Sequence, residues 1–200
     1  MRIFMVRHGE TLLNKKGCYY GLTDVSLSDY GIRQAEELGL LLADQTFDRV
    51  ISSPLSRALE TAALASGYEA ERIDTDPRLM EMGYGPYESL VFQELSPEVF
   101  RFLRDPEHVP APEGMEPIPA LVARLGDFLE DLRQDEREEQ LLVVCHGVAL
   151  RAAIRNLLDD AGAWKMPIEN CVLYRCAIED GRFSPIEKLA LDEPEQEAAP

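Results

Sequence analysis

The sequence has few of the residues that bind metals and none of the spacings that organise them. It contains three histidines and four cysteines in 200 residues. No histidines stand at i, i+4 and no cysteines form a CxxC pair. The cysteines are Cys18, Cys145, Cys171 and Cys176. We therefore predict no metal site, and we interpret the cysteines as reduced thiols in the core or in loops.

Long apolar runs and basic residues are also scarce. No apolar run approaches the roughly twenty residues of a membrane span. The N-terminus lacks the basic and apolar segments of a signal peptide, so we expect a cytosolic protein. The chain has 20 Lys and Arg against 37 Asp and Glu, a net charge of −17. This charge argues against nucleic acid and anionic membranes as partners, so an anionic small molecule would need a local arginine cluster.

Two apolar segments far apart in the sequence end in the same way. Met1–Val6 is followed by Arg7, His8 and Gly9, and Leu141–Cys145 is followed by His146 and Gly147. Such runs are typical of buried strands. The carboxyl ends of parallel strands meet at the sheet edge where ligands bind. Two imidazoles and an arginine at one edge indicate phosphate chemistry.

Further strands and helices alternate along the chain. Strands are predicted over 1–6, 47–51, 72–75 and 141–145. Helices are predicted from the N-cap Ser28 to about residue 44, from Pro54 to near Gly67, over 118–132 and over 150–158. The sequence also predicts a long loop over 9–27, a loop over 81–88, and a hairpin that pairs 171–178 with 182–189 across Asp180 and Gly181.

These elements predict one domain over residues 1–200. With 46% hydrophobic residues, the chain can build a three-layer α/β/α fold around a mostly parallel central sheet. The proline-rich segment 105–119 is expected to pass over the active-site edge of that sheet. The acidic tail from about residue 190 is expected to be solvated.

The residues at this edge have the properties that phosphoryl transfer requires. A neutral imidazole is a competent nucleophile, so His8 is the candidate, and Gly9 would let a phosphate approach the backbone. Arg7 and Arg57 can bind phosphate oxygens, and His146 can donate to them. An acidic residue must protonate the leaving group. Glu81, in a loop after a strand, is the candidate for that role, and Glu10 and Glu88 compete with it.

Four ordered segments resemble the histidine phosphatase superfamily, in the branch that contains cofactor-dependent phosphoglycerate mutase. They are Arg7–Thr11 with Asn14, Ser52–Ala62, Glu81–Glu88 and Val144–Gly147. The resemblance implies a phosphoglycerate mutase-like fold and a phosphatase without metal or organic cofactor. It implies that His8 is phosphorylated and that Glu81 exchanges the proton. It also implies a phosphate pocket of Arg7, Arg57 and His146, with Asn14, Thr23 and Gly147 on the substrate side.

The sequence departs from the family pattern at the rim of the expected pocket. Gly114-Met115-Glu116 stands where members often have Gly-Glu-Ser, and Tyr87 and Ser89 replace a tryptophan and a glycine. The organic part of the substrate therefore stays open. Within the family, Tyr20–Asp24 and the short chain look most like the α-ribazole phosphatases.

The sequence also allows other interpretations, one of which is a cysteine-dependent phosphatase. Cys145 and Arg151 have the spacing of cysteine-dependent phosphatases, but that loop needs more glycines than Gly147. The leading hypothesis is hydrolysis of a small phosphomonoester. The alternatives are a phosphoglycerate mutase-type isomerase and a non-catalytic binder of a phosphorylated ligand.

His108 is expected to be an exposed loop residue, and Trp164 is expected to lie in the core. The oligomeric state stays open.

Overall fold

The computed structural model describes residues 1–137 and 139–189, which form a central sheet covered by helices on both faces. The sheet order is β4-β3-β6-β1-β7-β8, and β9 pairs with β7. The strands are β1 (Arg2–Arg7), β3 (Arg49–Ser52), β4 (Asp74–Thr75), β6 (Gln140–Cys145), β7 (Leu173–Glu179), β8 (Arg182–Phe183) and β9 (Glu187–Leu189). Strands β4, β3, β6 and β1 run parallel, and β7 runs antiparallel to β1. The predicted α/β fold with a mostly parallel sheet is confirmed.

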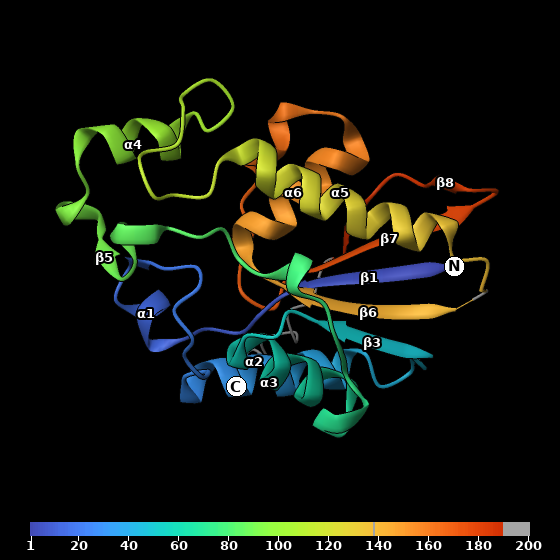
Figure 1. Cartoon of the computed structure of the whole chain (residues 1–200). Coiled ribbons are helices and arrows are strands. Elements are labelled where there is room, and N and C mark those ends of the chain that lie inside the picture. Colours follow the sequence, from blue (N-terminus) through green and yellow to red (C-terminus); the bar gives the residue numbers. More distant parts are fainter. Residues whose placement is uncertain (138, 190–200) are drawn as a thin grey trace, which may run out of the picture.

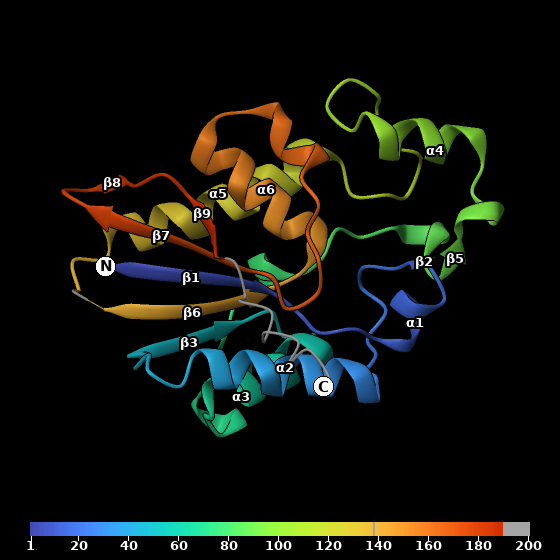
Figure 2. The ribbon, with the colours of Figure 1, turned by 180° about the vertical axis from the view of Figure 1, so that it is seen from behind.

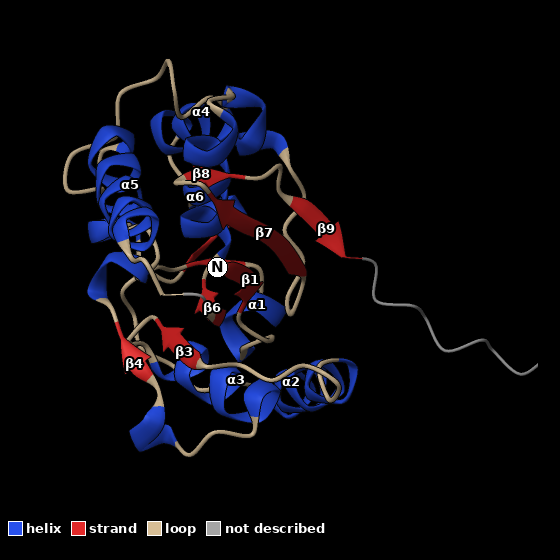
Figure 3. Ribbon diagram, turned by 90° about the vertical axis from the view of Figure 1, so that its right-hand side faces the viewer, coloured by secondary structure: helices blue, strands red, loops and turns tan. Residues whose placement is uncertain are grey.

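Two helices cover each face of this sheet. Helices α2 (Asp29–Leu41) and α3 (Ser56–Ser66) lie on one side, and α5 (Ile118–Gln134) and α6 (Gly147–Leu158) lie on the other (Figures 1 and 3). Side chains of a strand alternate between faces. Accordingly, Ile3 and Met5 pack in the core beneath α5 and α6, while Phe4 and Val6 pack in the core beneath α2 and α3.

The two helices on the α2 side begin in different ways. Helix α2 has the predicted N-cap, because the Ser28 hydroxyl accepts a hydrogen bond from the Gly31 amide at 3.1 Å. The predicted start of α3 at Pro54 is wrong, because α3 begins at Ser56. The reason is a distant cap: the Asp24 carboxylate accepts from the Ser56 amide and hydroxyl, both at 2.8 Å. Helix α3 ends at Gly67, as predicted, and this glycine has the left-handed conformation.

Several short elements lie beyond the carboxyl edge of the sheet, on the side away from the N-terminus (Figures 1 and 2). The predicted loop 9–27 contains α1 (Leu12–Lys15) and β2 (Cys18–Tyr19), and β2 pairs with β5 (Leu90–Val91). Helix α4 (Pro97–Arg104) was not predicted, although its N-cap Ser96 followed by Pro97 is a helix-start signal. The remaining turns are the 3-10 helices η1 (Ala70–Arg72), η2 (Pro77–Leu79), η3 (Gly85–Tyr87), η4 (Phe92–Glu94) and η5 (Ala161–Lys165).

The C-terminal hairpin turns at Asp180 and Gly181, as predicted, and both residues have positive φ. The predicted continuous strand over 182–189 is instead split into β8 and β9. Pro185 lies between them, and proline has no amide to donate to a strand ladder. The predicted acidic tail lies outside the described residues.

Candidate active site

The structure brings the two predicted strand ends together. Strands β1 and β6 are parallel neighbours in which Arg7 pairs with Cys145, and the His8 amide donates to the Cys145 carbonyl at 3.0 Å. As a result, the His8 and His146 rings have centroids 5.0 Å apart and an interplanar angle of 60°. The loop after β1 is fixed to the rest of the molecule because Asn170 Nδ2 donates to the His8 carbonyl at 2.8 Å.

A cavity of about 190 Å³ lies at this edge. Five of the residues predicted from the sequence line it, namely Arg7, His8, Asn14, Glu81 and Gly147. Its other lining residues include Tyr20, Tyr84 and Arg151, which sequence reasoning did not assign to the site. Tyr20 carries no local signal of this role, because only the fold of the 9–27 segment brings it to His8.

The His8 ring is held in one orientation. Its Nδ1 lies 2.7 Å from the Gly9 carbonyl oxygen, which can only accept a hydrogen bond, so Nδ1 carries the proton in the neutral ring. The other nitrogen, Nε2, then has a free lone pair. Burial, with help from the Arg7 and Arg57 charges, holds the pKa of His8 well below its usual value of 6.5. His8 is therefore a neutral imidazole at neutral pH, as a nucleophile requires.

Gly9 has a packing role that the sequence did not indicate. A Cβ at Gly9 would lie 2.6 Å from the Gly31 carbonyl oxygen in α2, a distance that no side chain tolerates. The Gly9 amide also donates to the Thr61 hydroxyl of α3 at 3.0 Å. Glycine at this position lets the loop after β1 contact α2 directly and thereby fixes the carbonyl that orients His8.

His146 and Arg57 lie behind the cavity and are both fully buried. Arg57 Nε donates to His146 Nδ1 at 3.2 Å, which leaves the His146 proton on Nε2, 2.7 Å from the Ser53 hydroxyl. Burial, together with His8 and the nearby arginines, holds the pKa of His146 well below 6.5. Arg57 is the second residue of α3, and neither it nor His146 is among the residues that line the cavity.

Arg7 presents an unpaired donor at the cavity. Its Nη1 donates to the Ile168 carbonyl, whereas its buried Nε has no hydrogen-bond partner among the described residues. Burial lowers the pKa of Arg7. An unsatisfied buried donor is costly, and an anionic oxygen in the cavity is the natural acceptor for it.

Asn14 has a free donor at the same cavity. Its Oδ1 accepts from the Thr11 amide at 3.1 Å and from the Tyr20 hydroxyl at 3.0 Å. These contacts orient the amide so that Nδ2, for which no described residue is an acceptor, can donate to a ligand. Tyr20 also stacks against Arg57, whose guanidinium carbon lies 4.7 Å from the ring centroid.

Glu81 is the one of the three candidate glutamates that reaches the cavity. It is 7% exposed, and its carboxylate receives three backbone amides: Met82 at 2.9 Å, Val148 at 3.1 Å and Ala149 at 3.0 Å. Two of these amides belong to the first turn of α6, where unpaired N–H groups favour an anionic acceptor. They fix both carboxylate oxygens.

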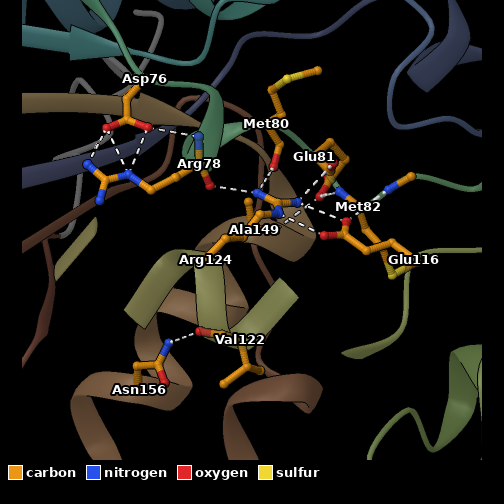
Figure 4. A network of polar contacts seen from close by, with 11 residues as sticks. Asp76, Arg78, Met80, Glu81, Met82, Glu116, Val122, Arg124, Ala149 and Asn156 are labelled. Carbon is orange, nitrogen blue, oxygen red and sulfur yellow. Dashed lines mark hydrogen bonds and ion pairs between the residues drawn. The ribbon is translucent and has the colours of Figure 1, made fainter. Parts of the chain in front are cut away.

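Arg124 of α5 holds the segment that carries Glu81 (Figure 4). Its guanidinium donates to the carbonyls of Arg78, Met80 and Glu81, and it forms a salt bridge with Glu116 at 2.8 Å. Glu116 in turn accepts from the Gly83 amide at 3.1 Å. The rim segment in which the sequence departs from the family pattern thus supports the Glu81 turn.

The other two glutamates have structural partners. Glu88 accepts from the amides of Gly21, Leu22, Thr23 and Tyr84 and from the Thr23 hydroxyl, all within 3.2 Å. The hydrogen bonds hold the pKa of Glu88 below its usual value despite partial burial. Glu10 accepts from Ser28. Neither lines the cavity.

Thr23 is not where the sequence predicts it, because Glu88 binds its hydroxyl and it does not line the cavity. It contributes through its backbone instead. The Thr23 and Gly21 carbonyls accept from Arg57 at 2.9 Å and 2.7 Å. Glu88 therefore fixes a loop that fixes Arg57, a role that no local pattern reveals.

Comparison with known proteins identifies the family of this chain. Residues 3–188 match the histidine phosphatase superfamily (branch 1). The chain belongs to this superfamily. Phosphoserine phosphatase 1 of Hydrogenobacter thermophilus is 32% identical over 188 residues, 91% of this chain and 89% of that protein. A Yersinia pestis protein named probable phosphoglycerate mutase is 30% identical over 181 residues, 88% and 84% of the two chains.

Solved structures of this superfamily have the same fold. The α-ribazole phosphatase of Shigella flexneri superposes with a TM-score of 0.81 at 28% identity, over 92% of this chain and 94% of that one. The chain is accordingly a histidine phosphatase by family, and its relatives bear the names of both phosphatases and mutases.

The remaining site predictions concern cysteine and metal. Burial raises the pKa of Cys145 to about 12, so the thiol does not ionise at neutral pH. All four described cysteines are free.

No group of three or more His, Cys, Asp or Glu in residues 1–137 and 139–189 is arranged to hold a metal ion. Within the same residues, no helix has the length and apolar character to cross a membrane.

Proposed function

We propose that this histidine phosphatase hydrolyses small phosphomonoesters through a phosphohistidine intermediate on His8. The observation that carries the proposal is the fixed, neutral His8 ring. Its Nδ1 is bound by the Gly9 carbonyl, and Nε2 is the free nitrogen of a side chain that lines the same cavity as Arg7 and Glu81.

In the first step, His8 Nε2 attacks phosphorus while the bond from phosphorus to the alcohol oxygen breaks. Glu81, protonated when the ester is bound, gives its proton to that oxygen, so the alcohol leaves neutral and the three backbone amides stabilise the carboxylate that forms. Arg7 Nε and Asn14 Nδ2 donate to phosphoryl oxygens. The buried Arg57 and His146 pair lies directly behind His8, where its positive charge stabilises the charge that develops.

In the second step, water attacks phosphorus and the bond to Nε2 breaks. The Glu81 carboxylate accepts the proton of the water, which restores both His8 and Glu81 to their starting forms. The products are the alcohol and inorganic phosphate. The cytosolic location predicted from the sequence stays part of this proposal.

The test is a trapping experiment with a phosphomonoester labelled on phosphorus. The protein should acquire a label that is stable in alkali and labile in acid, as a phosphoramidate is. His8→Ala should lose the label and nearly all turnover. Cys145→Ala, the matched control at the neighbouring strand end, should keep both. An acid-stable label that disappears in Cys145→Ala would overturn the assignment of His8.

Candidate organic halves come from the relatives, which include proteins named for phosphoserine and for α-ribazole phosphate. We propose that the natural substrate is a phosphorylated metabolite of this size class, with α-ribazole phosphate among the first compounds to assay. The resemblance of Tyr20–Asp24 to the α-ribazole phosphatases supports that choice.

A mutase is the second candidate, because several relatives from Yersinia have that name. A mutase must keep its product away from water while the phosphoryl group returns to another hydroxyl. The assay supplies 3-phosphoglycerate with 2,3-bisphosphoglycerate as primer and measures both phosphate release and 2-phosphoglycerate. We expect phosphate release to dominate, and efficient primed isomerisation with little free phosphate would promote the mutase.

A further inference from the structure

The reaction cavity adjoins a second and larger cavity of about 320 Å³. The two cavities share four lining residues, Tyr19, Tyr84, Val148 and Arg151. Pockets that hold a ligand the size of a cofactor or drug measure roughly 300–1,000 Å³. The reaction cavity alone falls below that range, so a substrate with a bulky organic half needs the second cavity, hereafter the side chamber.

The side chamber is lined mainly by aromatic and aliphatic side chains. Tyr19, Tyr84, Phe102 and Trp164 form its aromatic walls, and Leu103 and Ile118 are among its aliphatic ones. These residues come from β2, η3's N-terminal flank, α4, η5 and α5, which lie far apart in the sequence. Pro106, from the proline-rich segment 105–119, also lines the side chamber. Polar and apolar atoms contribute about equally to the accessible lining. Aromatic walls favour a planar ring, and the polar atoms can accept polar substituents on that ring.

Trp164 is held in position by a polar network outside the chamber. Its indole Nε1 donates to Glu107 Oε1 at 2.9 Å, and Arg155 Nε donates to the same oxygen at 3.1 Å. These hydrogen bonds hold the pKa of Glu107 below its usual value. The polar edge of the indole is satisfied by protein, so its ring is available to a ligand as a fixed apolar wall. The sequence predicts a core tryptophan, whereas Trp164 is half-buried at this cavity.

Arg151 lies where the two cavities meet. Its Nε donates to the Met166 carbonyl at 2.9 Å, and no described residue accepts from its terminal nitrogens. It is also the one charged residue among the described residues that line the side chamber. A planar guanidinium fixed in this way can stack on an aromatic ring.

From this lining we infer that the side chamber binds the organic half of the substrate and that this half is aromatic. The substrate class is then a phosphomonoester of an alcohol that carries an aromatic ring, placed between Trp164 and the Tyr19–Tyr84 pair while the phosphate lies at His8. The two tyrosine rings pack against each other with centroids 6.1 Å apart, and both residues line both cavities. This inference rests on the proposed function, because it assigns the phosphate to the reaction cavity.

The test compares phosphate esters whose alcohols have similar acidity, so that chemistry at phosphorus is matched. Ethyl phosphate has no ring, 2-phenylethyl phosphate adds an aromatic ring, and 2-cyclohexylethyl phosphate adds an apolar ring that is not planar. We expect kcat/KM for 2-phenylethyl phosphate to exceed that for ethyl phosphate about 10- to 100-fold, from burial of the ring. The cyclohexyl ester should fall between them.

Variants assign the preference to the side chamber. Trp164→Ala should lower the ratio of phenylethyl to ethyl kcat/KM by about tenfold. Phe92→Ala is the matched control, because Phe92 is an exposed aromatic residue that packs on Phe100 and lines neither cavity. It should leave the ratio unchanged. An equal decrease of the phenylethyl to ethyl kcat/KM ratio in both variants would contradict the assignment of the preference to the side chamber.

A binding measurement separates this inference from the proposed mechanism. Calorimetric titration of His8→Ala with ethyl and 2-phenylethyl phosphate measures the preference without turnover. A binding ratio near one, together with a kcat/KM ratio near one, would overturn the side chamber and leave the phosphatase intact. A preserved binding preference in a wild-type protein that hydrolyses none of the esters would overturn the proposed function alone. Equal efficiency of the phenyl and cyclohexyl esters would refute the aromatic assignment.

Discussion

The three histidines occupy two different electrostatic environments. His8 and His146 are buried beside arginines, and burial is the main reason that the pKa of each lies well below 6.5. His108 is exposed, and its hydrogen bond to Asp105 raises its pKa above 6.5. The sequence prediction of an exposed His108 is confirmed. Burial thus favours the neutral form of two imidazoles, whereas an ion pair favours the charged form of the third.

We expect these states to be visible by nitrogen-15 NMR of the imidazoles. At pH 6.5, His8 should be a neutral Nδ1–H tautomer, His146 a neutral Nε2–H tautomer, and His108 predominantly protonated. The buried pair should stay neutral well below pH 6.5. In the unfolded chain both would take up protons near that pH, so the free energy of unfolding should fall as pH decreases below 6.5. A buried ring that titrates at or above 6.5 would contradict the neutral nucleophile.

Substitution of Glu81 should slow hydrolysis most for esters whose alcohol needs a proton in order to leave. Glu81→Gln should slow hydrolysis of ethyl phosphate by about 10²- to 10⁴-fold, because its alkoxide is a poor leaving group. It should slow p-nitrophenyl phosphate far less, because nitrophenolate leaves without protonation. Steady-state kcat values for both esters provide the measurement. Equal slowing would assign Glu81 a purely structural role at the start of α6.

At the scale of elements, helix α5 supports the active site without contributing to the reaction cavity. Arg124 reaches from α5 to three carbonyls of the segment 78–81. It also pairs with Glu116, which holds Gly83. Because these contacts surround the backbone of Glu81, the position of the carboxylate depends on a helix more than forty residues downstream.

Arg124→Met should therefore lower both stability and activity. Loss of the donors to three partly buried carbonyls is expected to cost about 1–3 kcal/mol of unfolding free energy. Arg133→Met, on the same helix, removes the exposed pair with Glu130 and a long, exposed hydrogen bond to the Gly181 carbonyl at 3.4 Å, and it should change neither property measurably. Urea unfolding and kcat on ethyl phosphate provide the two readouts. Indistinguishable variants would indicate that Arg124 does not hold the Glu81 segment.

At the scale of the whole molecule, the proposed chemistry uses only side chains and water. We expect prolonged treatment with EDTA to leave kcat and KM unchanged, because nitrogen, not a metal-bound oxygen, attacks phosphorus. Phosphate release before and after chelation is the measurement, with buffer alone as the control. Loss of activity that divalent ions restore would count decisively against the phosphohistidine mechanism.

Local signals predicted much of this architecture and part of the site. The apolar runs before His8 and His146 were sufficient to predict that these two residues lie close together. The carboxyl ends of parallel strands meet at one edge of the sheet, whatever the structure of the intervening chain. Ser28 was sufficient for the start of α2. The start of α3 was missed because its cap, Asp24, is more than thirty residues from Ser56. The partners of Glu88 and the wall formed by Trp164 were beyond prediction for the same reason, since both depend on contacts between distant loops.

The position of β1 in the sheet has a consequence for how the chain acquires its activity. Arg2 pairs on one side with Gln140 and on the other with Ala177, so β1 lies between two strands that are synthesised more than 130 residues after it. Pairings this distant form slowly, because a long loop must close before any contact is gained. Until β6 emerges, the apolar β1 has neither neighbour and is an exposed, aggregation-prone segment. His8 and His146 therefore come together only after β6 has been synthesised, so the candidate active site cannot assemble on a partly synthesised chain.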